Sequence, residues 1–266
     1  MKLVPGAVII PCAISREVFA ALDSGSADAA VIPIENSLAG SVLEHFDLLL
    51  AHDVRVVRET LVRIRHNLIC IAGASIDEID RVFSHPVALA QCRRFLAEHS
   101  GMKAIAFYDT AGSVKQLVDL CDKHAAAIAS AAAAGYYGAE VLASDIEDDP
   151  ENYTRFFLVR PKNENCGEAE TDPEPNKLSI AFSVENRPGT LVAALSALSA
   201  QGTNLTKIES RPVQGKPWEY VFYVDCQIRA SDEGARALKA LGEHCGMVKE
   251  LGRYREGEKQ GIGIRE

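Results

Sequence analysis

Residues 29–41 read Ala-Ala-Val-Ile-Pro-Ile-Glu-Asn-Ser-Leu-Ala-Gly-Ser, and this stretch indicates the fold of the first half of the chain. The run from Ala29 to Ile34 is continuously apolar, which is typical of a strand buried on both faces of a sheet. A helical pattern of apolar residues follows, formed by Val42, Leu43, Phe46, Leu49 and Leu50. A buried strand that leads directly into a helix is the repeating unit of an α/β protein.

The same alternation of strand and helix recurs on both sides of this stretch. Strand-like runs lie at 8–11, 54–57, 66–71, 81–84, 103–107 and 154–159, with helical patterns between most of them, and the run 125–134 begins as a buried strand and becomes an Ala-rich helix. Parallel strands need a crossover helix between them, so this spacing predicts a largely parallel sheet.

The rhythm changes after residue 176. Strands are predicted at 177–184, 203–211, 219–227 and 246–251, and helices at 188–201 and 231–244. Pro188 suits the first turn of a helix and Gly202 suits its C-terminal end. This order is βαββαβ, the ferredoxin-like arrangement. The segment 161–176 is rich in acids and Pro and reads as a linker between domains, and 255–266 reads as a polar tail.

The net charge of −9 comes from two short stretches. Residues 145–151 contribute −5 and residues 161–176 contribute −4, so the rest of the chain is neutral. A chain without a basic block is a poor partner for nucleic acid or an anionic membrane. The seven Cys are too far apart for CxxC motifs, and no common cofactor, nucleophile or metal motif is present. Free thiols predict a reducing cytoplasm.

Three turns between strands and helices carry candidate ligand-binding side chains. Ligands of open α/β sheets bind outside the carboxyl ends of the strands, where helix N-termini also favour anions. The alternative is that these polar side chains serve as ordinary helix caps. The candidates are Asn36, Ser37 and Ser41 in the first turn, Gln91 after His85-Pro86 in the second, and Thr110 after Asp109 in the third.

A fourth candidate follows the acidic stretch 145–151. Thr154 offers a hydroxyl donor, and the planar guanidinium of Arg155 is suited to gripping a carboxylate. The alternative is that Arg155 pairs with neighbouring acids of the protein itself.

These motifs resemble those of the prephenate dehydratase family. The resemblance rests on 33–41 (Pro-Ile-Glu-Asn-Ser-Leu-Ala-Gly-Ser), 85–92 (His-Pro-Val-Ala-Leu-Ala-Gln-Cys) and 152–156 (Asn-Tyr-Thr-Arg-Phe), in the family's order. The segment 177–254 resembles an ACT domain, through 185–192 (Glu-Asn-Arg-Pro-Gly-Thr-Leu-Val) and 209–212 (Glu-Ser-Arg-Pro). Thr190 stands where the family usually has Ala.

The resemblance implies a two-lobed, periplasmic-binding-protein-like (type II) catalytic domain over 1–160, with the site between its lobes, and an ACT domain. We expect the lobe crossings near 60–63 and 143–144. In the implied reaction, prephenate loses CO2 and hydroxide to give phenylpyruvate, with no cofactor and no metal. Thr154 would donate to the departing hydroxyl. The substrate would be held by Asn36, Ser37, Gln91, Thr110, Arg155 and Phe156.

The resemblance also implies a regulated oligomer. Phenylalanine would bind the ACT domain of a homodimer or homotetramer through Gly189, Thr190, Leu191, Val192, Glu209, Ser210, Arg211 and Pro212. Three alternatives remain open: an arogenate dehydratase, a transport solute-binding protein, and a phenylalanine-binding regulatory protein with impaired catalysis. The last follows from a strand–turn–helix unit that family members carry ahead of residue 8 and that we expect to be missing here.

Overall fold

Two compact units make up this protein in a computed structural model that describes residues 4, 6–162, 174–213, 215 and 218–258. Unit 1 combines Met1–Asn36, Gly40–Val62 and Arg155–Glu266, and unit 2 combines Ser37–Ala39 with Arg63–Thr154. Apart from the short excursion into unit 2 at Ser37–Ala39, the chain changes units at Val62/Arg63 and at Thr154/Arg155. The lobe crossings expected near 60–63 and 143–144 stay predictions, and most of the predicted linker and tail lies outside the described residues.

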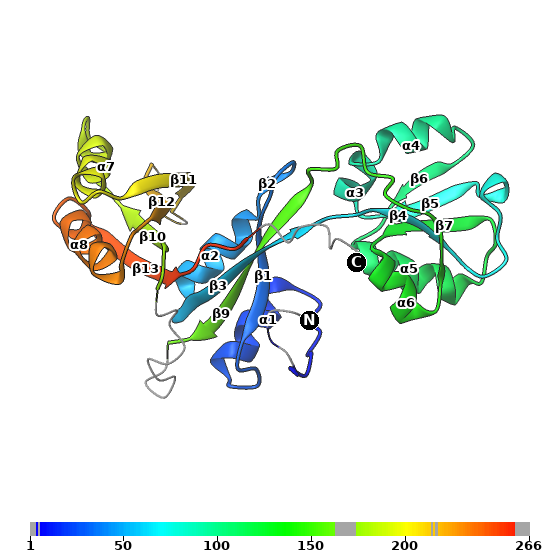
Figure 1. The fold of residues 1–266 in the computed structure, drawn as a ribbon, viewed down its shortest axis with the longest axis horizontal. Coiled ribbons are helices and arrows are strands. Elements are labelled where there is room, and N and C mark those ends of the chain that lie inside the picture. Colours follow the sequence, from blue (N-terminus) through cyan, green and yellow to red (C-terminus); the bar gives the residue numbers. More distant parts are fainter. Residues whose placement is uncertain (1–3, 5, 163–173, 214, 216–217, 259–266) are drawn as a thin grey trace. The chain divides into compact units, whose positions relative to one another are not determined.

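Unit 2 is built on a five-stranded sheet in the order β6-β5-β7-β4-β8 (Figure 1). Its strands are β4 (Asn67–Cys70), β5 (Arg81–Ser84), β6 (Lys103–Ala106), β7 (Ala125–Ala129) and β8 (Glu140–Ala143). Its helices are α3 (Pro86–Ala90), α4 (Arg93–Glu98), α5 (Thr110–Leu120) and α6 (Ala131–Tyr137), with a 3-10 turn at Ile76–Glu78.

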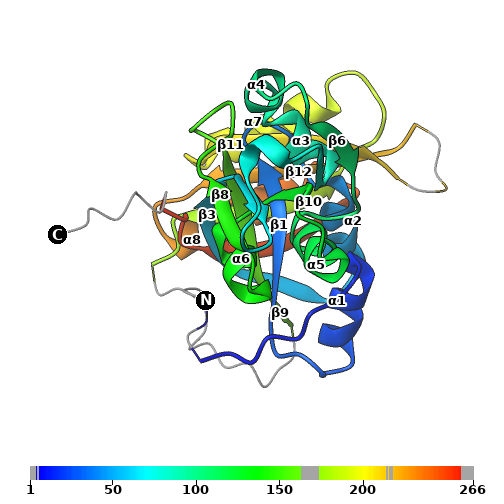
Figure 2. The same cartoon turned by 90° about the vertical axis from the view of Figure 1, so that its right-hand side faces the viewer.

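Helices cover both faces of this sheet. Leu68, Val82 and Ile128 pack with α3 and α4, whereas the neighbouring strand residues pack with α5 and α6. Helices α5 and α6 lie side by side (Figure 2). Because both faces are covered at the centre of the sheet, β7 is entirely apolar: it reads Ala-Ala-Ala-Ile-Ala with every residue buried.

The sheet of unit 2 is mixed, so the prediction of a largely parallel sheet is only partly right. β5 pairs in parallel with β6 and β7, whereas β4 pairs antiparallel with both β7 and β8. Strand 66–71 is not preceded by a crossover helix, since β3 leads into it directly. Parallel pairing requires such a crossover, and its absence leaves β4 free to run antiparallel.

The first part of unit 1 is a four-stranded sheet in the order β2-β1-β9-β3. Its strands are β1 (Ala30–Asn36), β2 (Gly40–Ser41), β3 (Val54–Arg63) and β9 (Tyr153–Pro161), and its helices are α1 (Ser15–Asp23) and α2 (Leu43–Ala51). The strand predicted at 8–11 does not form, and Val8 is 90% exposed. An apolar run forms a strand only where a neighbouring strand accepts its hydrogen bonds.

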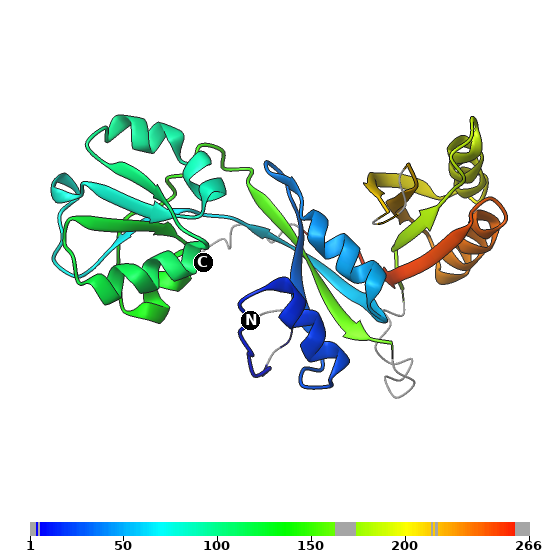
Figure 3. The ribbon, with the colours of Figure 1, turned by 180° about the vertical axis from the view of Figure 1, so that it is seen from behind.

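The second part of unit 1 confirms the predicted βαββαβ order (Figure 3). Its elements are β10 (Lys177–Ser183), α7 (Thr190–Ala200), β11 (Asn204–Pro212), β12 (Tyr220–Gln227), α8 (Ser231–Gly242) and β13 (Met247–Tyr254). The strands form an antiparallel sheet in the order β11-β12-β10-β13. One face of this sheet, with Leu178, Ile180 and Phe182, packs against α7 and α8.

The other face of the βαββαβ sheet is buried as well. Ala181, Tyr223 and Tyr254 belong to the same apolar core as Phe46 of α2 and Phe157 of β9. Unit 1 is therefore one packed body, in which the βαββαβ domain completes the core of the β1–β9 sheet. Among the described residues, no helix is both long and apolar enough to cross a membrane.

Candidate functional site

Within unit 2, three side chains from separate segments form one hydrogen-bonded cluster. Asn152 Nδ2 donates to Gln91 Oε1 at 2.9 Å, and His66 Nε2 lies 2.9 Å from the same oxygen and therefore donates to it. Asn152 is fully buried. Gln91 ends α3, the short helix that Pro86 opens after β5. Gln91 and Asn152 were singled out by their motifs, whereas nothing in the sequence spacing pointed to His66.

Ser37 fixes the backbone next to this cluster. Its Oγ donates to the carbonyl of Glu151 at 3.0 Å and accepts from the amide of Tyr153 at 2.9 Å, while its own amide donates to the Tyr153 carbonyl. Ser37 is therefore engaged with the chain that leads to Thr154. Thr154 follows Asn152 by two residues, and in extended chain this spacing puts both side chains on one face.

The acidic stretch 145–151 organises the same part of unit 2. Glu147 Oε2 accepts from the amide of His66 at 2.9 Å, and the Asp148 carboxylate accepts from the amides of Arg93 and Arg94 at the start of α4. Asp148 also donates its amide to the Gln91 carbonyl at 2.7 Å. Two of the five acidic side chains of 145–151 thus accept hydrogen bonds from backbone amides.

Thr110 is the first residue of α5 and follows the carboxyl end of β6. β5, β6 and β7 are parallel, so α3, α5 and α6 all begin at the carboxyl ends of their strands. Asp109 caps α5 by accepting from the amide of Gly112, and His85 Nδ1 accepts from the amide of Val87 in α3. Two of the three turns therefore contain a side-chain helix cap, but the caps are Asp109 and His85, and α2 has no side-chain cap, so the capping predicted for Ser and Asn of the first turn is wrong.

Arg155 and Phe156 follow Thr154 on β9 and belong to unit 1. Arg155 is 8% exposed, and its Nε donates to Glu59 Oε2 at 2.6 Å. Its Nη1 donates to Asp225 Oδ2 at 2.5 Å and its Nη2 to the Tyr254 hydroxyl at 3.1 Å. Burial alone lowers the pKa of an arginine, but Tyr254, Asp225 and Glu59 together raise the pKa of Arg155 above its usual value. Arg155 therefore stays charged.

Asn36 ends β1 and lies in unit 1, directly before Ser37. Ser41, on β2, is linked to the βαββαβ domain: its Oγ donates to Glu209 Oε2 at 2.9 Å and accepts from Lys207 Nζ at 2.9 Å. Lys207 also donates to Glu35 at 2.7 Å. The roles predicted for Asn36, Ser37, Gln91, Thr110, Thr154, Arg155 and Phe156 toward a substrate remain predictions.

The first effector signature borders a pocket of about 170 Å³. Gly189 adopts φ +86° directly before α7, a conformation that favours glycine. The hydroxyl of Thr190, where the family usually has Ala, donates to the carbonyls of Glu185 and Arg187, so it is satisfied within its own loop. The pocket is lined by Val184, Glu185, Asn186, Arg187, Thr190, Leu191, Trp218, Tyr220 and Phe222.

The second effector signature contacts the rest of unit 1. Arg211 donates from Nη2 to Asp47 Oδ2 of α2 at 2.6 Å, and Glu209 accepts from Ser41. Asp47 raises the pKa of Arg211. Ser210, Pro212 and Val192 are exposed.

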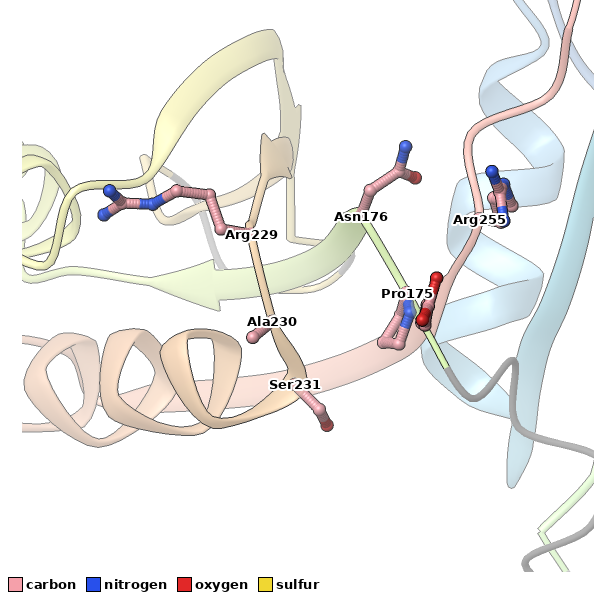
Figure 4. A pocket seen from close by; sticks show the side chains of 7 residues that line it. Pro175, Asn176, Arg229, Ala230, Ser231 and Arg255 are labelled. Carbon is pink, nitrogen blue, oxygen red and sulfur yellow. The ribbon is translucent and has the colours of Figure 1, made fainter.

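Another pocket, of about 440 Å³, lies where β10 and α8 begin (Figure 4). We assign no function to it, because its Arg229 is bonded to Glu233.

Comparison with known proteins places the chain in a family. The family model for prephenate dehydratase matches residues 1–164, and the ACT domain model matches residues 178–243. The chain belongs to the prephenate dehydratase family.

One relative is arogenate dehydratase/prephenate dehydratase 2 of Arabidopsis thaliana, 39% identical over 95% of this chain and 68% of the relative. Prephenate dehydratase of Arthrobacter aurescens, solved in complex with L-Phe, has a TM-score of 0.87 and 32% identity and covers 99% of this chain and 88% of its own.

A third protein, described as a novel type of quorum-quenching acylase, has a TM-score of 0.84 and 32% identity over 94% of this chain and 90% of its own. One fold can therefore accompany more than one chemistry, and the function must be argued from the site. The family's periplasmic-binding-protein-like α/β fold and its ACT domain, both expected from the motifs, are confirmed.

Proposed function

We propose that this chain is a prephenate dehydratase, a carbon–oxygen lyase that converts prephenate to phenylpyruvate. Its membership of the dehydratase family supports this function, together with the hydrogen-bonded cluster of His66, Gln91 and Asn152 and with Ser37, which is bonded to the backbone at the start of the strand that carries Thr154. This arrangement is the observation that carries the proposal, because it brings together residues of all three catalytic-domain motif segments, 33–41, 85–92 and 152–156, directly before Thr154 in the chain.

In the proposed reaction, the bond between the ring and its carboxylate breaks and CO2 departs. The electron pair of that bond enters the ring and the hydroxyl on the opposite ring carbon leaves with a proton, as water. The Thr154 hydroxyl donates a hydrogen bond to that departing oxygen, where negative charge develops in the transition state. Side chains that bind and orient the dianion supply the remaining rate acceleration.

An assay of phenylpyruvate formation tests this function. Wild-type protein should turn over prephenate, Thr154→Val should lose at least about 100-fold in kcat, as expected for a lost transition-state donor, and Thr154→Ser should retain most activity because it keeps the hydroxyl. Near-normal turnover by Thr154→Val would remove Thr154 from the mechanism. Release of phenylalanine from arogenate, measured in parallel, decides which substrate is preferred.

We further propose that phenylalanine regulates the enzyme at the ACT domain. The Arthrobacter aurescens protein was solved with L-Phe, and here both signatures, Gly189–Val192 and Glu209–Pro212, are present. Saturating phenylalanine should lower turnover and raise the unfolding temperature through ligand linkage. Absence of a calorimetric binding signal would refute effector binding.

We also propose a homodimer or homotetramer in the cytoplasm. β11 is an edge strand of the described ACT sheet, and it exposes Leu205 and Ile208. Exposed apolar edges favour association between copies. Sedimentation equilibrium gives the oligomer number, and a monomer at micromolar concentration would contradict the proposal.

A further inference from the structure

Arg155 occupies a buried network that joins the catalytic and ACT parts of unit 1. Glu59 comes from β3 of the catalytic part, whereas Asp225 and Tyr254 come from β12 and β13 of the ACT domain. All four residues are buried. A guanidinium in this position is held from both parts of unit 1 at once.

The rest of the network closes around the same groups. Ser179 Oγ donates to Asp225 Oδ1 at 2.5 Å and lies 2.6 Å from the Tyr254 hydroxyl, which therefore donates to Ser179. Lys177 Nζ donates to Glu59 Oε1 at 2.9 Å. The two buried cations, Arg155 and Lys177, are thus matched by two buried carboxylates, and a paired set of this kind has a single favourable geometry.

Adjacent residues of a strand point to opposite faces. Arg155 therefore directs its side chain away from the face that carries Thr154, while the peptide bond between them makes the position of one depend on the other. The guanidinium also lies over the ring of Phe157, 4.7 Å from its centroid. Its hydrogen-bonding groups are engaged by the protein's own carboxylates and hydroxyl, so the network itself accounts for a buried arginine next to Thr154.

We propose that Arg155 is a positioning residue: anchored by Glu59, Asp225 and Tyr254, it fixes the start of β9 and with it the Thr154 hydroxyl, so the ACT domain is part of the catalytic scaffold. This inference rests on the proposed dehydratase function and replaces the predicted grip of Arg155 on a substrate carboxylate.

The deciding variant is Asp225→Asn in the full chain, because Asp225 belongs to the ACT domain and is bonded directly to Arg155 of β9. We expect kcat for prephenate to fall by about 10- to 100-fold, since a displacement of about 1 Å at a reacting group has that effect. KM should change by less than about threefold, because the variant leaves the substrate-binding side chains in place. A grip on substrate predicts the reverse, an altered KM with kcat retained, and that result would overturn the proposal.

The matched control is Asp47→Asn. It breaks an ion pair between α2 and β11 in the same unit, whereas Asp225→Asn breaks one between β12 and β9. Its basal kcat should equal that of the wild type, and a loss equal to that of Asp225→Asn would show a general effect of loosening the ACT domain. If Asp225→Asn fails to unfold cooperatively, Tyr254→Phe, which removes a single hydroxyl from the network, takes its place. We then expect the same result, a lower kcat with KM nearly unchanged.

Hydrogen–deuterium exchange tests the anchor without any substrate. Asp225→Asn should raise the exchange rate of the amides of 154–157 and leave the exchange rates of β5 and β7 in unit 2 unchanged. Asp47→Asn should leave the exchange rates of all these amides unchanged. Unchanged exchange at 154–157 would overturn the positioning role. A wild-type chain inactive on prephenate would refute the proposed function, whereas the exchange comparison still decides whether the anchor holds β9.

Discussion

Replacing Glu59 by Gln should strongly destabilise unit 1. The Glu59 side chain is 1% exposed and accepts from three donors: Arg155 Nε at 2.6 Å, Lys177 Nζ at 2.9 Å and the amide of Gly257 at 3.0 Å. The amide of Gln keeps the shape but removes the negative charge and turns one acceptor into a donor that faces other donors. Arg155 then keeps the buried carboxylate of Asp225, whereas Lys177 is left with the partly exposed carboxylate of Glu256, at 3.2 Å.

Breaking a buried pair by neutralising one partner costs about 3–5 kcal/mol. For a body of 150–250 residues, each kcal/mol lowers the unfolding temperature by about 2–4 °C, so we expect a decrease of about 6–20 °C. Differential scanning calorimetry measures it directly. The control Asp119→Asn removes a carboxylate paired with Lys115 at 2.7 Å on the surface, and it should change the free energy of unfolding by less than about 1 kcal/mol.

The double variant Glu59→Gln/Lys177→Met tests whether charge balance is the cause. Removing the cation as well should recover at least about 1 kcal/mol relative to the sum of the single variants, since directly paired groups couple by about 0.5–3 kcal/mol. A Glu59→Gln variant as stable as the Asp119→Asn control, or a strictly additive double variant, would refute the argument from buried charge.

Three further predictions concern the site, the effector pocket and pH. Ser37→Ala removes the hydroxyl that bonds Glu151 and Tyr153, and should lower kcat/KM for prephenate by about 10-fold or more, whereas Thr203→Val, which removes a buried hydroxyl of the ACT domain, should affect stability alone. Trp218 is the single tryptophan of the chain and lines the pocket of the first effector signature, so phenylalanine should change its fluorescence saturably and glycine should not. Burial, with Asp148 and Glu147, raises the pKa of Cys92 to about 12, and burial with Asp225 does the same for Cys226, so stability present below pH 9 should be lost as pH rises from about 9 toward 12. Urea midpoints at pH 8 and pH 10 measure this loss, which Cys92→Ala/Cys226→Ala should reduce.

Local patterns predicted most elements because their causes are local. Pro188, Gly189 and Gly202 mark the ends of α7, and the apolar run of β1 shows its burial directly. The direction of β4 was not predictable, since it depends on which strand receives its hydrogen bonds. The strand expected at 8–11 failed for the same reason.

The partners of Arg155 were beyond sequence patterns. The alternative to a substrate-binding role was a pairing of Arg155 with neighbouring acids, yet the structure pairs it with Glu59 and Asp225, at separations of 96 and 70 residues. Lys177 and Ser179 alternate with apolar residues on β10, a pattern typical of a solvated strand face. That face is buried instead, because the catalytic part of unit 1 supplies the charges that match it.

The discontinuous make-up of unit 1 has a consequence for how the protein is synthesised. Unit 2 is almost one uninterrupted segment, whereas the core of unit 1 joins Phe19 and Ile32 to Leu251 and Tyr254. On the ribosome, unit 2 can therefore fold as soon as residue 154 has emerged, while the first 62 residues must wait for nearly the whole chain. We expect nascent chains stopped near residue 200 to resist protease over unit 2 and to be cleaved within β1 and α2. Chains completed past Gly257 should resist cleavage in both.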